Sequence, residues 1–427
     1  MYRLRPPHVF VHKRVYENPR AVARMERILK AIGNPPIQEV GAGDTDRVLE
    51  MVGPAEDASI VSGRVRHGIE RRDADPSFLF NTFEWDESKR SKPVTRRSGS
   101  FARRIAAAMA GVGEDFAFSR REANWMSGRT QYVCQGGWGI HSLKGCAHKC
   151  NYCDEGYLVN FMLDLEEFAD CVGRMMERRP QQKLYRYDLY SDSICFEPEY
   201  GASAILSERF ARTKDKYLLY YTKSDNVGHL LGLPHKSHAI FYCTLATETV
   251  CGKIERGTPS MQARIEGLRR CQEAGYRVRV GFSPIIPVPH WRREATECLE
   301  QLFAKVRPET VRLWILSLMS AEETERLIGA DMLDPQIADA MRRAAGQLTE
   351  QFAQPFPPEV RAEVYSYYID EIGRLSPETP VSLCSETRPI WDRLAGRLRM
   401  SPDNLYCCCG AQSAPGAQGA GRKEALR

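Results

Sequence analysis

The sequence predicts an α/β protein whose centre is a partial barrel of six strand–helix repeats, (β/α)6. Strand-like runs recur six times between Thr130 and Leu316, and helical stretches separate them, which is typical of parallel β/α architecture. Because six repeats fall short of the eight in a closed barrel, an incomplete barrel and an open sheet both fit the count. With 427 residues, 43% of them hydrophobic, the chain can form two or three domains with a sizeable core.

An α/β extension of residues 1–105 is expected to precede the barrel. Its surplus of Lys and Arg is densest in Lys89–Arg104, which would either attract phosphate groups or form a solvated linker. The segment Glu70–Ser100 is polar and rich in Pro, Ser and Arg, so we expect a loop there. The predicted elements are helices at Asn18–Ile32, Asp44–Met51 and Arg103–Ala110, and a short strand at Ile37–Val40.

The barrel is assigned to residues 106–320, and a mainly helical, cysteine-containing region to residues 321–410. Barrel strands are expected at Thr130–Cys134, Leu184–Leu189, Tyr217–Thr222, His238–Thr244, Arg277–Phe282 and Thr310–Leu316. Helices are expected at Leu165–Arg178, Ala202–Arg212, Val227–Leu231, Ser260–Ala274 and Arg292–Val306, then at Pro335–Phe352, Pro358–Leu375 and Pro389–Leu398, with a strand-like Pro380–Leu383. Residues 411–427 are rich in Gly, Ala and Ser and are expected to be disordered.

The N-terminus is charged throughout and lacks the apolar core of a secretory signal. No run of 18 apolar residues predicts a membrane span, so we expect a cytoplasmic protein with no membrane partner. In a reducing compartment the 14 cysteines favour metal or cluster ligation over disulfides.

The most informative stretch is a Gly-flanked loop that holds Cys146, Cys150 and Cys153 with the spacing C-x3-C-x2-C. Three thiolates in one loop can hold three irons of a [4Fe–4S] cluster and leave the fourth iron without a protein ligand. An open metal position is where chemistry occurs. The alternative is a structural zinc knuckle with His148 or Cys134 as its fourth ligand.

This motif, with the aromatic Tyr152 before its third Cys, resembles the cluster loop of the radical S-adenosylmethionine (SAM) superfamily. The resemblance implies that the amino and carboxylate groups of SAM chelate the open iron. It also implies that one electron from the cluster cleaves SAM to methionine and a 5′-deoxyadenosyl radical, which abstracts a hydrogen atom. The protein would bind, orient and protect the reactants, and a flavodoxin or ferredoxin would supply the electron.

Within that superfamily the chain resembles the spore photoproduct lyase branch. Three patches carry the resemblance: Ser191-Asp192, Tyr221-Thr222-Lys223, and Ile254–Tyr276 with the following Pro284–Pro287. Weaker likeness extends to the N-terminal third and to Leu383–Glu386.

The resemblance implies that Ser191 and Lys223 contact SAM, with Lys223 at its carboxylate, and that Tyr152 lies beside the adenine or the cluster. Thr244 is a further candidate for the SAM site. These polar residues lie at or after strand ends, where parallel β/α sheets place their ligand sites. Taken singly, each could also be an ordinary strand-end or loop residue.

Two positions depart from the lyase pattern. Those lyases return a hydrogen atom from a Cys two residues before the Ser-Asp pair, and here that position is Leu189. They also carry a Tyr directly after the third cluster Cys, and here that position is Asp154. Cys195 would replace the missing donor or be a buried, inert thiol. Asp154, beside Glu155, would orient a substrate hydroxyl or simply face solvent.

Three consecutive cysteines, Cys407, Cys408 and Cys409, follow Cys384 near the C-terminus. Adjacent side chains normally diverge, so their convergence needs an irregular backbone, which Gly410 permits. We expect some of these four thiols to hold a second iron–sulfur cluster; a vicinal disulfide, a reactive thiol pair and incidental tail cysteines are the alternatives.

The sequence therefore predicts a radical SAM enzyme that abstracts hydrogen from a nucleoside-like small molecule in a biosynthetic tailoring reaction, with sulfur insertion from a second cluster as one form. One alternative is lyase-like repair of a DNA lesion, in which the basic N-terminal third grips DNA phosphates. The other is a non-catalytic metal-binding module.

Overall fold

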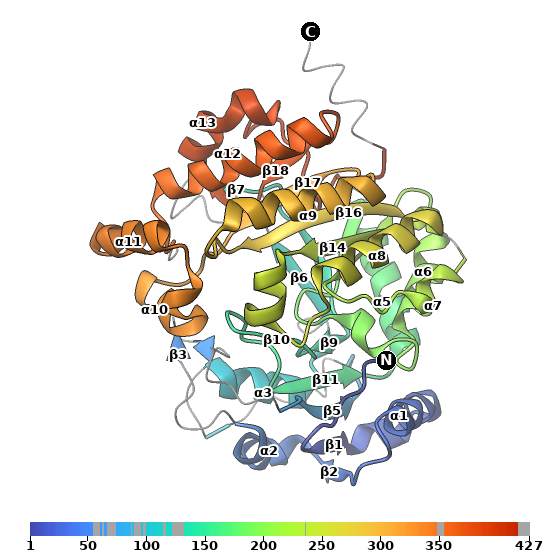
Figure 1. Cartoon of the computed structure of the whole chain (residues 1–427). Helices are drawn as coiled ribbons and strands as arrows, with labels where there is room; N and C mark the ends of the chain where they lie inside the picture. Colours follow the sequence, from blue (N-terminus) through green and yellow to red (C-terminus); the bar gives the residue numbers. More distant parts are fainter. Residues whose placement is uncertain are drawn as a thin grey trace.

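An eight-stranded sheet forms the centre of the molecule in this computed structural model (Figure 1). The structure describes residues 1–53, 60–61, 64–65, 74–86, 88, 95–96, 100–113, 117–121, 132–234, 236–347 and 354–416. The strands lie in the order β18-β17-β16-β14-β13-β12-β8-β6, all parallel except β6, which is antiparallel to β8. Their bounds are β6 Phe118–Arg121, β8 Gly137–Ile140, β12 Leu184–Tyr187, β13 Tyr217–Thr222, β14 Ala239–Leu245, β16 Arg277–Ile285, β17 Val311–Ile315 and β18 Val381–Leu383.

Strands β8, β12, β13, β14, β16 and β17 lie side by side in the order in which they follow in the chain, and the strands between them in sequence belong to other sheets. The predicted six-strand parallel arrangement is therefore confirmed. No pairing joins β6 to β18 among the described residues, and the barrel is therefore open. The first barrel strand was predicted wrongly: it is β8, not Thr130–Cys134. Within that range the described residues form β7 (Tyr132–Val133), which pairs antiparallel with β19 (Glu386–Thr387) instead. Gly136, with φ +71°, lies between β7 and β8.

Helices cover the outer face of this sheet (Figure 1). They are α5 Leu165–Arg178, α6 Ala202–Ala211, α7 Gly228–Leu231, α8 Met261–Glu273 and α9 Trp291–Lys305, close to their predicted positions. The side chain of Ser260 caps α8 by accepting from the backbone N–H of Ala263. All seven residues of β14 are buried, as expected for a parallel strand covered on both faces.

A second sheet, β2-β1-β5-β11-β9, lies below the first in Figure 1 and carries the N-terminal helices. Its elements are β1 Val9–His12, β2 Gln38–Val40, β5 Ser77–Asn81, β9 Leu143–Lys144 and β11 Leu158–Met162, with helices α1 Pro19–Ala31, α2 Thr45–Val52 and α3 Ser100–Ala110. The short strands β3 Ile60–Val61 and β4 Arg64–Val65 form a hairpin. The predicted loop at Glu70–Ser100 was wrong where β5 forms, because the apolar run Ser77–Asn81 is fully buried. Strands β9 and β11 flank the cysteine loop and join it to this sheet, across the predicted division at residue 105.

The C-terminal region is helical, as predicted, and then returns to the main sheet. Its helices are α10 Ala321–Ile328, α11 Pro335–Ala344, α12 Pro358–Leu375 and α13 Arg388–Leu398. Residues 411–416 are ordered, contrary to the predicted tail, because the backbone N–H groups of Lys183 and Leu184 donate to the carbonyl of Ala411 at 2.9 and 3.1 Å. The rest of that tail, residues 417–427, lies outside the described residues.

Strand register defines an inner face of the main sheet, opposite helices α5–α9. Directly paired residues point to the same side, and the pairs Arg186–Leu219, Tyr221–Tyr242 and Gly281–Arg312 therefore share this face. Cys407, Cys408 and Cys409 pack there against Leu184, Leu219, Ile240 and Tyr242. No helix of the described residues is long and apolar enough to cross a membrane.

Candidate functional site

The cysteine loop leaves β9 through a turn that only glycine permits. Gly145 has φ +103°, and a Cβ there would lie 1.9 Å from the carbonyl oxygen of Leu158. Its N–H donates to the carbonyl of Tyr190 at 2.9 Å, which ties the loop to the end of β12. Gly145 thus sets the direction in which the chain enters Cys146.

A short antiparallel pairing then anchors the middle of the loop. Strand β10 (Lys149–Cys150) pairs with β15 (Glu255–Arg256), and Cys150 stands opposite Glu255. The N–H of Cys153 donates to the carbonyl of Cys150 at 2.9 Å. None of the three thiols forms a disulfide. Burial raises the pKa of Cys146, and the charges of the nearby Asp192, Cys153 and Cys150 add to the rise.

Beside Cys150 lies a buried charge network centred on Glu255. Lys223 Nζ donates to Glu255 Oε1 at 2.8 Å, Arg264 pairs with Oε2 at 2.7 Å, and the Tyr152 hydroxyl also donates to Oε1. Burial alone would raise the pKa of Glu255, but Lys223, Arg264 and these hydrogen bonds lower it to about 2. The network fixes the Lys223 ammonium beside the cysteine loop.

The residues that the sequence assigned to SAM are placed as follows. Lys223 uses two of its three donors, on Glu255 and on the carbonyl of Ser283 at 3.2 Å, and one donor remains for a ligand. Ser191 Oγ and Thr244 Oγ1 are buried and have no hydrogen-bond partner among the described residues. Orphaned buried hydroxyls are uncommon in folded proteins and fit a site that takes a polar ligand. The Tyr152 hydroxyl donates to Glu255, and the place of this residue beside the adenine or the cluster stays a prediction.

A second buried cluster, formed by His148, Asp192 and Cys195, joins the cysteine loop to the ends of β12 and β13. His148 Nε2 lies 3.0 Å from Asp192 Oδ2 and His148 Nδ1 lies 3.0 Å from the carbonyl of Gly257. Asp192 also accepts from Thr222 Oγ1 and from the N–H of Lys223, each at 2.7 Å. Cys195 Sγ lies 3.5 Å from His148 Nε2 and is fully buried. His148, Asp192 and Cys195 could meet one cation, but their protein hydrogen bonds already satisfy them. Hydrogen return by Cys195 gains no support from this burial and stays a prediction.

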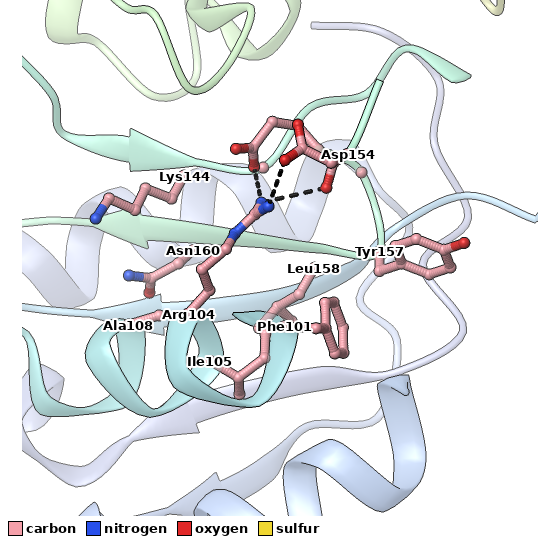
Figure 2. A pocket seen from close by; sticks show the side chains of 12 residues that line it. Phe101, Arg104, Ile105, Ala108, Lys144, Asp154, Tyr157, Leu158 and Asn160 are labelled. Atoms are coloured by element: carbon pink, nitrogen blue, oxygen red, sulfur yellow. Dashed lines mark hydrogen bonds and ion pairs between the residues drawn. The ribbon is translucent and has the colours of Figure 1, made fainter. Parts of the chain in front are cut away.

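Asp154 and Glu155 do not face open solvent. Arg104 of α3 donates to Asp154 Oδ2 at 3.1 Å and pairs with Glu155 Oε2 at 2.6 Å, and Figure 2 shows the Arg104 side chain directed from α3 toward Asp154. Burial raises the pKa of Glu155 to about 7, although Arg104 opposes the rise. These residues line a pocket with Phe101, Lys144 and Tyr157. Asp154 therefore joins the cysteine loop to α3 by an ion pair.

The C-terminal cysteines are only partly brought together. Cys407 Sγ and Cys409 Sγ lie 3.9 Å apart. Cys408 Sγ points elsewhere, to the carbonyls of Val280 at 3.6 Å and Thr310 at 3.9 Å. Cys384 follows β18, which pairs with β17 on the same sheet.

Sequence reasoning missed three residues of the site. Glu255 and Arg264 both lie in the patch Ile254–Tyr276 that carried the family resemblance, but only the tertiary pairing with Lys223 reveals their role. Arg104 ends the basic run Lys89–Arg104, but that run predicted phosphate binding or a linker and not an ion pair with Asp154.

Comparisons with known proteins agree with this geometry. A model of the spore photoproduct lyase family matches residues 137–324. Curated spore photoproduct lyases of Bacillus subtilis (strain 168) and Geobacillus sp. (strain Y412MC61) are 26% identical over 176 residues and 25% identical over 168 residues. These alignments cover 39% and 37% of this chain, which spans about half the length of the two relatives, 51% and 48%.

Solved structures match over most of the chain. A spore photoproduct lyase variant with bound AdoMet and dinucleoside spore photoproduct has a TM-score of 0.59 at 15% identity, covering 89% of this chain and 99% of its own. A spore photoproduct lyase complexed with the dinucleoside spore photoproduct has a TM-score of 0.58 at 15% identity, covering 90% and 100%. At this identity the likeness shows the fold.

The names of these relatives agree with the prediction of an enzyme of the radical SAM class. The chain thus carries a match to the spore photoproduct lyase domain, and its predicted resemblance to that branch of the radical SAM superfamily is confirmed.

Proposed function

We propose that the chain is a radical SAM enzyme whose [4Fe–4S] cluster is held by Cys146, Cys150 and Cys153. The observation that carries the proposal is that these three thiols, none of which forms a disulfide, lie in one loop where Cys150 stands opposite the Glu255 that pairs with Lys223. The buried hydroxyls of Ser191 and Thr244, which lack a hydrogen-bond partner among the described residues, add to it. When bound, the cluster supplies one electron to SAM and thereby yields a 5′-deoxyadenosyl radical. No second Cys/His pair stands at zinc-ribbon distance from this loop in the sequence, which disfavours a zinc knuckle.

The chain's own residues bind and orient SAM in this proposal. Lys223 donates a hydrogen bond from its remaining N–H to the SAM carboxylate, and a charged pair of this kind forms a strong hydrogen bond. Glu255 and Arg264 hold Lys223 in one position, because both are fully buried and paired. Ser191 and Thr244 supply hydroxyls to the polar groups of SAM. Burial of these groups excludes water from the site.

We propose a nucleoside-like substrate, because similar proteins include structures solved with a dinucleoside photoproduct. A tailoring reaction is favoured over lesion reversal because Leu189 and Asp154 replace the thiol and phenol that the lyases use to return hydrogen. Arg104 holds Asp154 in an ion pair, so this carboxylate is a positioning residue. Sulfur insertion is one form that such a reaction takes if a second cluster is present.

The experiment that tests the proposal is SAM cleavage after anaerobic reconstitution with iron and sulfide. With dithionite, or with a flavodoxin or ferredoxin, the wild type should form 5′-deoxyadenosine. The Cys150→Ala variant should form none above background. The matched control is Cys298→Ala, which removes a buried thiol of α9 outside the loop and should retain full cleavage. Equal cleavage by Cys150→Ala and the wild type contradicts the proposal.

The second candidate function is reversal of a DNA lesion, which the names of the relatives favour. Incubation of the reconstituted wild type with the dinucleoside spore photoproduct distinguishes the two. Lesion reversal would convert it to dinucleoside and would accompany a salt-dependent affinity for duplex DNA. Tailoring predicts SAM cleavage without that conversion and without duplex binding at low salt.

A further inference from the structure

Strand pairing places Cys134 beside Cys384. Strand β7 pairs antiparallel with β19 in the register Val133–Glu386 and Tyr132–Thr387. The next step of this register sets Cys134 against Ser385, and Cys384 is its chain neighbour. Cys384 Sγ lies 3.8 Å from the hydroxyl oxygen of Ser385, the residue that this register sets against Cys134.

The same segment of chain contacts the three consecutive cysteines. Gln135 Nε2 donates to the carbonyl of Leu405, and a Cβ on Gly137 would lie 3.1 Å from the carbonyl oxygen of Cys409. Cys407 and Cys409 have their sulfur atoms 3.9 Å apart, while Cys408 turns away between them. Four thiols from three distant parts of the sequence therefore meet on the inner face of the sheet.

Two buried arginines face this group of thiols. Arg186 Nη1 lies 4.0 Å and Arg312 Nη1 lies 3.7 Å from Cys409 Sγ, and their exposed fractions are 5% and 4%. In the part of the chain that the structure describes, neither guanidinium pairs with a carboxylate. Arg186 Nε and Nη2 and Arg312 Nε have no hydrogen-bond partner there either. Buried cations need an anionic partner, and metal-bound thiolates would supply it.

We propose that Cys134, Cys384, Cys407 and Cys409 ligate a second iron–sulfur cluster on the inner face of the sheet. The ligand set predicted from the sequence was drawn from Cys384, Cys407, Cys408 and Cys409. In the proposed set Cys134 takes the place of Cys408. Because each iron would have its own thiolate, the centre is closed to substrate. The proposal does not rest on SAM cleavage, since its ligands are separate from those of the cysteine loop.

The spacing of the sulfur atoms favours a cluster over a single zinc ion. Thiolates around one tetrahedral zinc lie about 3.8 Å apart, given a Zn–S distance of about 2.3 Å. Cys407 and Cys409 have this spacing, with their sulfur atoms 3.9 Å apart, but a zinc site needs further ligands at the same range. Among the described residues no three of these four sulfur atoms lie within 4.8 Å of one another, and the same is true of Cys146, Cys150 and Cys153. The two groups of thiols are thus alike in that neither has three sulfur atoms close enough to bind one metal ion together.

The test measures iron and acid-labile sulfide after anaerobic reconstitution of the full chain carrying Cys146→Ala, Cys150→Ala and Cys153→Ala. We expect about four irons and four sulfides per chain in this triple variant. Adding Cys134→Ala or Cys409→Ala should remove them. Adding Cys408→Ala should not, because Cys408 Sγ contacts backbone carbonyls. Circular dichroism establishes that each variant is folded.

A folded triple variant without iron overturns the proposal, as does iron that survives Cys134→Ala or is lost with Cys408→Ala. One bound zinc per chain with no uptake of iron and sulfide overturns it too. Should the triple variant not fold, the Cys134→Ser variant in the otherwise wild-type chain takes its place. Its iron should then fall from about eight to about four per chain while SAM cleavage persists, and an unchanged iron content contradicts the proposal.

Discussion

The two groups of cysteines in this chain differ in how they are built. Cys146, Cys150 and Cys153 lie in one loop, and hydrogen bonds within it and to β15 position them. Cys134, Cys384, Cys407 and Cys409 come from three parts of the chain, and strand pairing and sheet contacts bring them together. The neighbouring charges differ as well. The loop has the paired Lys223 and Glu255, while the second group faces arginines that lack a carboxylate partner.

This difference shows that a site built from one local segment is easier to predict from sequence than a site assembled from distant segments. A local motif can be identified because its residues lie at a characteristic spacing within one short segment of the sequence. A site assembled across the sheet shows only as unexplained cysteines until the fold is known. Each prediction below changes one group, so that its effect on the other measures how separate the two are.

The largest effect is expected for Glu255→Gln at the cysteine loop. The substitution leaves Lys223 and Arg264 buried without the one carboxylate charge that they share, which should cost about 3–5 kcal/mol of unfolding free energy. It should also weaken SAM binding, because Lys223 loses its fixed position. Urea denaturation and SAM titration measure the two effects. Glu266→Gln on the exposed face of α8 is the control and should change neither.

Gly145→Ala should come next, because the added Cβ would meet the backbone of Leu158 and the residue has a positive φ. We expect a loss of about 3 kcal/mol of stability and of the iron bound by the cysteine loop. Iron in the C-terminal group should remain. Thermal unfolding and iron analysis check this, with Gly373→Ala, where a Cβ has open space, as the control. Equal loss of iron from both groups would show that they are not independent.

Lys223→Gln should weaken SAM binding by about 10- to 100-fold, which corresponds to the loss of a charged hydrogen bond of about 1.5–3 kcal/mol. Iron content should stay at the wild-type value, since Lys223 is not a thiol ligand. Equilibrium dialysis with labelled SAM measures the change. Lys253→Gln, an exposed neighbour, should bind SAM as the wild type does. Unchanged SAM affinity in Lys223→Gln would remove Lys223 from the SAM site.

The smallest effect is expected for Gly410→Ala in the C-terminal group. Its Cβ would collide with the end of the Gln135 side chain, which can move, so we expect a loss of about 1 kcal/mol. Iron in the C-terminal group should fall in part, while SAM cleavage should persist. Denaturation and iron analysis measure the change, and full loss of SAM cleavage would contradict the separation of the two groups.

The sequence predicts much of the fold because its signals are local. The strand at Tyr217–Thr222 matches its predicted bounds, and the helices between the barrel strands are close to theirs. The strand at Thr130–Cys134 was misplaced because β7 finds its partner β19 far along the chain, and no local pattern shows that pairing.

The candidate site follows the same rule. The loop cysteines, Ser191 and Lys223 could be named from motifs. The role of Glu255 depends on Lys223 and Arg264, which meet it only in the folded chain. The replacement of Cys408 by Cys134 depends on strand register and on the direction of one side chain.

The central claim is that the chain has two separate centres and that only the one in the cysteine loop cleaves SAM. The most direct test measures 5′-deoxyadenosine and bound iron together in the reconstituted wild type and in the triple variant of Cys146, Cys150 and Cys153. Our account predicts about four irons per chain in the triple variant and no 5′-deoxyadenosine. Formation of 5′-deoxyadenosine by the triple variant at the wild-type rate would contradict it.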